Sequence, residues 1–154
     1  FIQSYVLKTD HVFNSVLNVK LHPKYIYDIV NFMIIKRDSQ MSSPFHNITK
    51  SNHMCSIVDI NGNPLIFGSN YYNIKNQNTT HAEVDAFNKL VNKQGRTRKK
   101  ITIDIIIIRT NGGNSKPCCD CMQKLNEMSI RFRIRNVYFT NNEYDIDVIK
   151  FSKL

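Results

Sequence analysis

The chain has 154 residues, enough for one domain that buries about two-thirds of its unfolded surface. Hydrophobic residues make up 42% and charged residues 21%, as in soluble globular proteins. No uninterrupted apolar stretch reaches membrane-spanning length, so we expect no membrane partner. The formal net charge of +9 favours polyanionic partners such as nucleic acid or nucleotides, although a composition rich in Lys and Asn also accounts for it without a partner.

Cysteine usage indicates the compartment. The four cysteines include a C-x-x-C pair, which suits a metal in a reducing compartment better than a disulfide scaffold. The first ten residues have no basic end followed by an apolar core, so we expect no signal peptide. The predicted location is the cytoplasm, with the nucleus as an alternative.

The beginning of the chain is the hardest part to interpret. Short apolar stretches alternate with polar ones over residues 1–22, which we treat as an N-terminal extension of uncertain structure. Residues 23–154 are predicted to form a single domain. It begins with a helix from Pro23 to about Ser39, because Pro is tolerated at the first helical position and apolar residues follow at helical spacing.

A hairpin and a second helix are predicted next. The hairpin pairs residues 54–59 with residues 65–68 around Asn61-Gly62-Asn63, since Asn-Gly between two apolar runs is a strong turn signal. The polar stretch 69–79 is interpreted as a loop. A helix follows from about Thr80 to Asn92.

The second half alternates strands with a helix. Residues 101–108 are nearly all β-branched, which indicates a strand buried on both faces, and Pro117 opens a helix to about Met128. Strands are predicted at 135–140 and, running back, at 143–150. This order predicts an α/β fold whose mixed sheet has helices on both faces, with strands 101–108 and 135–140 parallel.

Four side chains with metal and proton-transfer chemistry fall at the starts of two of these helices. His81 and Glu83 open one helix, and Cys118 and Cys121 open the next, so both pairs lie at the same edge of the sheet. One imidazole and two thiolates satisfy a catalytic zinc and leave its fourth position open for water, while the carboxylate can move protons. Free N–H groups at the helix start are expected to lower the pKa of the thiols. The pattern H-x-E…P-C-x-x-C is the signature of zinc-dependent nucleobase deaminases.

Simpler interpretations exist for each half of this pattern. Thr80 and Glu83 also match a capping box, and a C-x-x-C alone is a weak metal signal. The combination at two helix starts favours the catalytic zinc. Cys119 lies on a different face and is not expected to be a ligand, and His46, His53 and Cys55 are interpreted as ordinary positions rather than a second metal site.

These motifs resemble those of the cytidine deaminase superfamily, and the likeness covers roughly residues 24–150. The resemblance implies a three-layer α/β/α fold with a five-stranded sheet, zinc held by His81, Cys118 and Cys121, and Glu83 as the proton shuttle. Gly68-Ser69-Asn70 resembles a G-x-N segment of the family, whose Asn contacts the substrate sugar.

Three further residues are assigned to substrate binding. Ala82 lies between His81 and Glu83, and Ser115 resembles the polar residue that precedes P-C-x-x-C in many members. Arg109 ends the buried strand, where it either holds a phosphate or is a solvated strand end.

The predicted function is hydrolytic deamination of a cytosine-containing nucleoside or nucleotide. Zinc lowers the pKa of a water and makes hydroxide available, which adds to the amino-bearing ring carbon while Glu83 transfers protons. A His as first ligand is usual in deoxycytidylate, tRNA-adenosine and polynucleotide-editing branches, whereas the final antiparallel strand is typical of cytidine-type members. Two alternatives stay open: a deaminase that edits a base within RNA, including tRNA, or DNA, and a catalytically idle deaminase fold that binds nucleic acid.

A basic edge is predicted far from the zinc. It would comprise Arg96, Arg98, Lys99, Lys100, Arg131, Arg133 and Arg135. This edge either binds nucleic acid or is simply solvated. The resemblance also implies a homo-oligomer.

Overall fold

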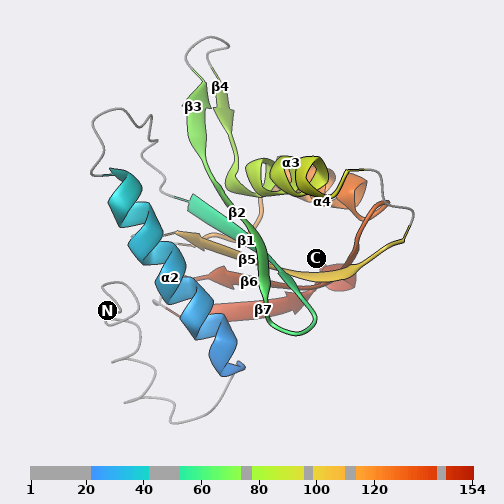
Figure 1. Ribbon diagram of the computed structural model, residues 1–154, viewed down its shortest axis with the longest axis horizontal. Helices are drawn as coiled ribbons and strands as arrows, with labels where there is room; N and C mark the ends of the chain where they lie inside the picture. The colour runs from blue at the N-terminus through green and yellow to red at the C-terminus, as the bar shows by residue number, and fades with distance from the viewer. Residues whose placement is uncertain (1–21, 42–52, 74–77, 96–98, 110–113, 142–144) are drawn as a thin grey trace.

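The computed structural model describes residues 22–41, 53–73, 78–95, 99–109, 114–141 and 145–154 (Figure 1). In chain order the elements are α2 (Lys24–Met41), β1 (His53–Asp59), β2 (Pro64–Ser69), β3 (Tyr71–Asn73), β4 (Asn78–Thr80), α3 (Ala82–Gln94), β5 (Thr102–Arg109), α4 (Cys119–Met128), β6 (Arg133–Thr140), β7 (Ile146–Lys150) and the short 3₁₀ turn η2 (Phe151–Lys153). Within these ranges no helix combines the length and apolar character needed to cross a membrane. The predicted extension, residues 1–22, lies outside the described part except for His22.

Five strands form the main sheet in the order β2-β1-β5-β6-β7. β5 and β6 pair in parallel, and the other neighbours are antiparallel. The strand predicted to be buried on both faces is the central β5, in which residues 103–108 are all buried. The predicted mixed sheet and the antiparallel last strand are therefore confirmed.

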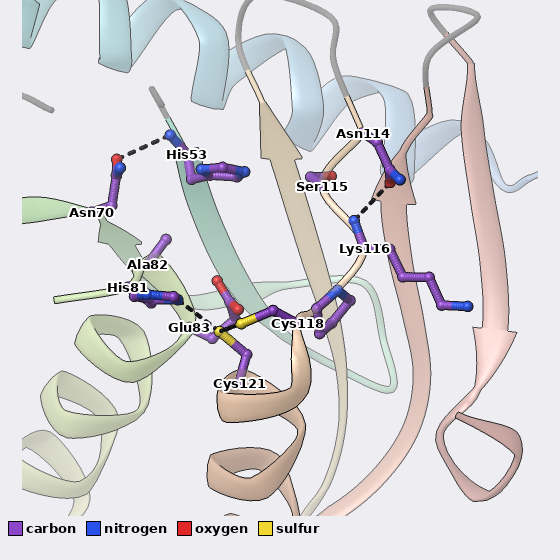
Figure 2. Close-up of a pocket in the computed structure, with 11 residues that line it drawn as sticks. His53, Asn70, His81, Ala82, Glu83, Asn114, Ser115, Lys116, Cys118 and Cys121 are labelled. Atoms are coloured by element: carbon purple, nitrogen blue, oxygen red, sulfur yellow. Dashed lines mark hydrogen bonds between the residues drawn. The ribbon is translucent and has the colours of Figure 1, made fainter. Parts of the chain in front are cut away.

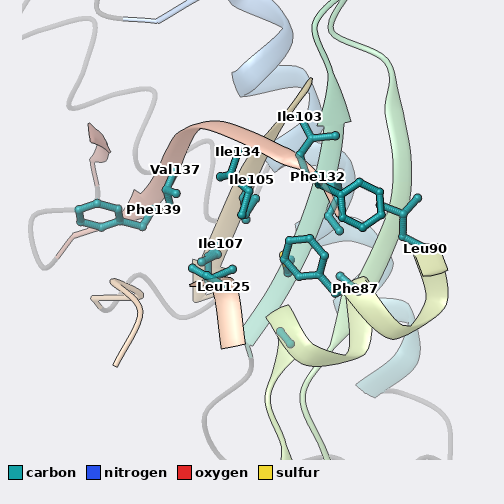
Figure 3. Close-up of a cluster of buried hydrophobic side chains, with 14 residues drawn as sticks. Phe87, Leu90, Ile103, Ile105, Ile107, Leu125, Phe132, Ile134, Val137 and Phe139 are labelled. Carbon is teal, nitrogen blue, oxygen red and sulfur yellow. The ribbon is translucent and has the colours of Figure 1, made fainter. Parts of the chain in front are cut away.

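Helices cover both faces of this sheet, as predicted (Figure 1). Alternate residues of a strand project to opposite faces, so β5 contributes to two separate cores. Ile103, Ile105 and Ile107 pack with the apolar faces of α3 and α4 (Figure 3). Ile106 and Ile108 pack with α2 on the other face. The fold is thus a three-layer α/β/α sandwich.

The turn between β1 and β2 forms where Asn-Gly predicts it. Gly62 has a φ of 86°, a left-handed conformation that glycine adopts without a steric penalty. The carboxylate of Asp59 accepts hydrogen bonds from the main-chain N–H groups of Asn61 and Asn63, each at 2.9 Å. The turn fixes the register of the hairpin and hence the position of its open end, where the site lies.

One local prediction and one of the simpler interpretations are wrong. The stretch 69–79 is not simply a loop, because β3 and β4 form an antiparallel ribbon in which Tyr71 pairs with Thr80. No capping box forms at α3, because Thr80 ends β4 and the residue at the N-cap is His81, which makes no side-chain capping bond. Strand pairing between β3 and β4 has displaced the helix start by two residues.

Candidate metal centre and active site

Two helix starts meet at one edge of the sheet. His81 is the residue before α3, with an extended backbone (φ −75°, ψ 153°), and Cys118 holds the same place before α4 (φ −78°, ψ 177°). Cys121 lies in the first turn of α4. The potential ligand atoms of these three residues all lie within 4.8 Å of one another (Figure 2). We call them the metal triad.

The donor set of the metal triad fits zinc. Nδ1 of His81 is 2.8 Å from Sγ of Cys121, and the two sulfur atoms are 3.5 Å apart. Zinc bonds of about 2.0 Å to nitrogen and 2.3 Å to sulfur place two tetrahedral ligands roughly 3.5–3.8 Å apart. The three side chains therefore need only small adjustments to surround one ion, and nitrogen with sulfur is the combination that zinc prefers.

Glu83 is the carboxylate that the sequence pattern predicts beside the triad. It is only 4% exposed and lines the same cavity as the triad (Figure 2). Two residues apart within a helix, Glu83 and His81 would point in nearly opposite directions. They converge because His81 lies before the helix in an extended conformation and Glu83 lies inside it.

The pKa of the Cys121 thiol, without a metal, is shifted in the direction opposite to the prediction. Burial raises the pKa of Cys121 above its ordinary value, and the neighbouring Glu83 carboxylate raises it further, through its charge and a hydrogen bond. The expected lowering by the helix start is thus outweighed at Cys121. A cation bound by the triad favours the thiolate, so metal binding at this residue is coupled to loss of a proton.

A cavity of about 250 Å³ opens above the triad. This is slightly below the usual size of ligand pockets, about 300–1,000 Å³. Its lining consists of His53, Asn70, His81, Ala82, Glu83, Asn114, Ser115, Lys116, Pro117, Cys118 and Cys121. Three of the four residues predicted to bind substrate, Asn70, Ala82 and Ser115, are therefore here, whereas Arg109 lies outside the lining at the end of β5.

Ser115 has a structural network of its own. Its hydroxyl donates to the carbonyl of Ile107 at 2.7 Å, accepts the main-chain N–H of Thr140 at 2.8 Å and lies 2.8 Å from Oγ1 of Thr140. These bonds tie the segment that leads into Cys118 to the ends of β5 and β6. The hydroxyl therefore positions the metal-binding loop.

Asn70 and His53 form one unit at the open end of β1. The side-chain oxygen of Asn70 accepts the main-chain N–H of His53 at 2.9 Å, and the N–H of Asn70 donates to the carbonyl of His53 at 3.2 Å. His53 lines the cavity, a position that the sequence analysis missed. The available signal was the hairpin, whose register pairs Met54 with Ser69 and so brings His53, the first residue of β1, next to Asn70.

The remaining cysteines occupy the positions expected of residues that are not ligands. Cys55 is fully buried in β1, and Cys119 is exposed. Within the described ranges, the metal triad is the one group of His, Cys, Asp or Glu side chains close enough to hold an ion. His46, considered with His53 and Cys55 for a second site, lies outside those ranges.

The basic residues predicted to form one edge divide into two environments. Lys100 donates to the carbonyl of Ser129 at 3.0 Å and Arg131 to that of Gly95 at 3.1 Å, so the ends of α3 and α4 do lie side by side. Arg135 instead pairs with the fully buried Asp104, on the α2 face. Arg96 and Arg98 lie outside the described residues.

An α/β/α domain that gathers an imidazole, two thiols and a buried carboxylate around one cavity has the architecture of zinc-dependent nucleobase deaminases. The chain belongs to the cytidine and deoxycytidylate deaminase family, because the family's zinc-binding region matches residues 33–140. A comparison with curated protein sequences gives no match.

The chain is similar to two solved structures. The cytidine deaminase from Burkholderia pseudomallei is 19% identical, with a TM-score of 0.54 over 79% of this chain and 92% of that chain. The cytidine deaminase from Mycobacterium leprae is 16% identical, with a TM-score of 0.45 over 76% of this chain and 91% of that chain. At 19% identity the likeness to the first of these structures concerns the fold.

Proposed function

We propose that the protein hydrolyses the exocyclic amine of a cytosine-containing nucleoside or nucleotide, converting cytosine to uracil with release of ammonia. The observation that carries this proposal is the convergence of Glu83 with the metal triad in one cavity. A structural zinc site needs four protein ligands, whereas three ligands with an adjacent carboxylate suit catalysis. Membership of the deaminase family supports the same assignment.

His81, Cys118 and Cys121 would hold the zinc. Zinc bound there supplies a water molecule whose pKa is lowered towards neutrality. Glu83 lies beside the triad, lines the same cavity and is nearly fully buried. With zinc bound, Glu83 would take a proton from that water, deliver it to the ring nitrogen of the base, and transfer the second proton to the departing amine.

The rest of the cavity would hold the nucleoside. Ala82 is almost fully buried at the cavity wall and leaves room for a flat base. Asn70 offers an amide group at the wall next to His53, a suitable partner for a sugar hydroxyl. Ser115 acts on the substrate indirectly, by positioning the loop before Cys118.

The test is ammonia release from cytidine, deoxycytidine, CMP, dCMP, adenosine and a mixture of single-stranded oligonucleotides. We expect turnover of a small cytosine substrate. A Glu83→Gln variant should keep one zinc per chain, measured by elemental analysis, and lose roughly 10²–10⁴-fold in kcat, because the proton shuttle is removed and the ligands are not.

Other results would select another function. Release from oligonucleotides alone would indicate a base-editing enzyme, and release from adenosine alone would indicate an enzyme that acts on adenine rather than cytosine. Salt-sensitive oligonucleotide binding without any ammonia release would indicate an idle fold. A Glu83→Gln variant that turns over at the parental rate would contradict the role assigned to Glu83.

A further inference from the structure

His53 lies at the end of the cavity away from the reacting groups. Figure 2 shows its ring on the opposite side of Glu83 from Cys118 and Cys121. The two hydrogen bonds with Asn70 use the main chain of His53. A substitution of the side chain leaves both bonds in place, so the imidazole can be tested apart from the frame that holds it.

Arg109 stands directly opposite His53 on the neighbouring strand. Residues paired in this way in an antiparallel sheet project to the same face, with Cβ atoms about 4.5–5.5 Å apart. The next pair on the same face consists of Cys55, two residues after His53, and Ile107, two residues before Arg109. Both lie in the core against α3 and α4. His53 and Arg109 therefore project to the face of the sheet from which the metal triad is built.

The charged groups around the cavity are distributed unequally. Among the described residues of its lining, Glu83 is the one carboxylate, and it belongs to the reacting end. The far end has His53, with the half-buried Arg109 beside it. Lys116 adds positive charge at the rim, although its side chain extends away from the cavity in Figure 2. A guanidinium next to an imidazole provides charge-assisted donors that suit a phosphate better than a neutral hydroxyl.

We propose that His53 and Arg109 bind the phosphate of a nucleoside monophosphate, so that the preferred substrate is a cytosine nucleotide rather than a free nucleoside. This assignment rests on the proposed deaminase function, because it places the base at Glu83 and the phosphate at the opposite end of the cavity. Both residues set specificity through binding, and neither takes part in proton transfer.

Ligand binding tests the assignment without turnover. In the zinc-loaded Glu83→Gln variant, calorimetry should give a Kd for CMP or dCMP lower than that for cytidine or deoxycytidine by on the order of 10- to 100-fold. Adding Arg109→Ser should remove most of this preference and His53→Gln part of it, measured as the ratio of the Kd values for nucleoside and nucleotide. Equal affinities for nucleotide and nucleoside would overturn the assignment.

Arg133→Ser is the matched control. Arg133 is exposed and begins β6, paired with the first residue of β5, so it lies at the end of the sheet opposite Arg109. The variant loses the same charge from the chain, and the preference for nucleotides should persist in it. A loss equal to that in Arg109→Ser would show a general charge effect and overturn the assignment.

Turnover separates this proposal from the proposed function. In the parent protein kcat/KM should be higher for the nucleotide, and Arg109→Ser should lower it mainly through KM. Equal kcat/KM for nucleoside and nucleotide overturns the phosphate assignment and leaves the deaminase function intact. Deamination confined to cytosine within oligonucleotides overturns the choice of a mononucleotide. Lack of turnover on every cytosine substrate overturns the deaminase function, and the binding measurement then decides the phosphate assignment by itself.

Discussion

The four cysteines have different surroundings, which set their reactivity at the scale of single residues. Cys55 is fully buried, and burial raises the pKa of its thiol well above the ordinary value, with the Glu83 and Asp85 carboxylates adding to the effect. Cys119 is exposed on α4. It lies between Cys118 and Cys121 in the sequence but is not a member of the metal triad. Because the thiolate is the reactive form of cysteine, these two residues should lie at opposite ends of a reactivity scale.

Thiol labelling under native conditions checks this ranking. In the zinc-loaded protein we expect one thiol to react rapidly, Cys119, because Cys118 and Cys121 are occupied by the metal. After chelation the exposed Cys118 should become reactive as well, while Cys55 should react only on unfolding. Mass spectrometry of labelled peptides identifies the residues. Rapid modification of Cys55 in the folded protein would contradict the burial described here.

The metal triad and Glu83 could be predicted from sequence because their chemistry is encoded in short spacings. His53 could not, because its position depends on the hairpin register and on a main-chain bond to Asn70, 17 residues away. Ser115 lines the cavity, but its hydrogen-bond partners, Ile107 and Thr140, belong to strands that only the fold brings together. Spacing therefore predicts ligands better than it predicts the residues that surround a substrate.

At the scale of elements, the contact between β2 and α3 positions half of the active site. A Cβ atom added at Gly68 would lie 2.5 Å from the main-chain nitrogen of Ala86 and 2.6 Å from the carbonyl oxygen of Ala82. Asp85 reinforces the contact by accepting the main-chain N–H of Ser69 at 2.9 Å. The start of α3, with His81 and Glu83, thus rests directly on the backbone of β2.

Substitution of Gly68 by Ala should therefore disturb the site as well as the fold. The backbone atoms that the new methyl group meets cannot rotate away, so α3 must shift, at a cost of about 1–3 kcal/mol in the free energy of unfolding. We expect weaker zinc binding and a lower kcat, measured by metal titration and ammonia release.

Gly95 is the contrasting glycine, at the other end of α3. Its φ of 64° makes Ala unfavourable, but nothing lies within 4 Å of an added Cβ. Gly95→Ala should therefore lower stability without changing zinc affinity. If Gly68→Ala bound zinc as tightly as the parent protein, the close contact of Gly68 with α3 would not be what positions His81 and Glu83.

The elements that could be predicted are those with a strong period or an apolar run, such as β5 and the α3 and α4 helices. The β3–β4 ribbon was missed because each of its strands has three residues, too few to show an alternating pattern; only pairing between Tyr71–Asn73 and Asn78–Thr80 makes them strands. The same pairing explains why the helix begins after His81 rather than at Thr80.

At the scale of the whole molecule, the site exists because two connections end at the same edge of the sheet. The chain enters α3 after the β3–β4 ribbon and enters α4 after β5. A hydrogen bond from Arg131 to the carbonyl of Gly95 links the ends of the two helices that lie away from the site. An ion pair between the buried Asp104 and the exposed Arg135 joins β5 to β6 on the opposite face. The metal triad spans the remaining gap between α3 and α4, so a bound zinc would act as a cross-link between them.

Removal of the metal should consequently lower the stability of the entire domain. A ligand that binds the folded state alone, at a hundredfold excess over its Kd, adds about 2.7 kcal/mol to the free energy of unfolding. For a domain of this size, each kcal/mol corresponds to roughly 2–4 °C in Tm, so chelation should lower the Tm by about 5–10 °C.

Cys121→Ser should have a low Tm that no longer responds to zinc or chelator, because one triad ligand is weakened. Cys119→Ser removes a neighbouring thiol outside the triad and should respond like the parent. A Tm independent of zinc in both the parent and Cys119→Ser would show that the metal does not link the two helices.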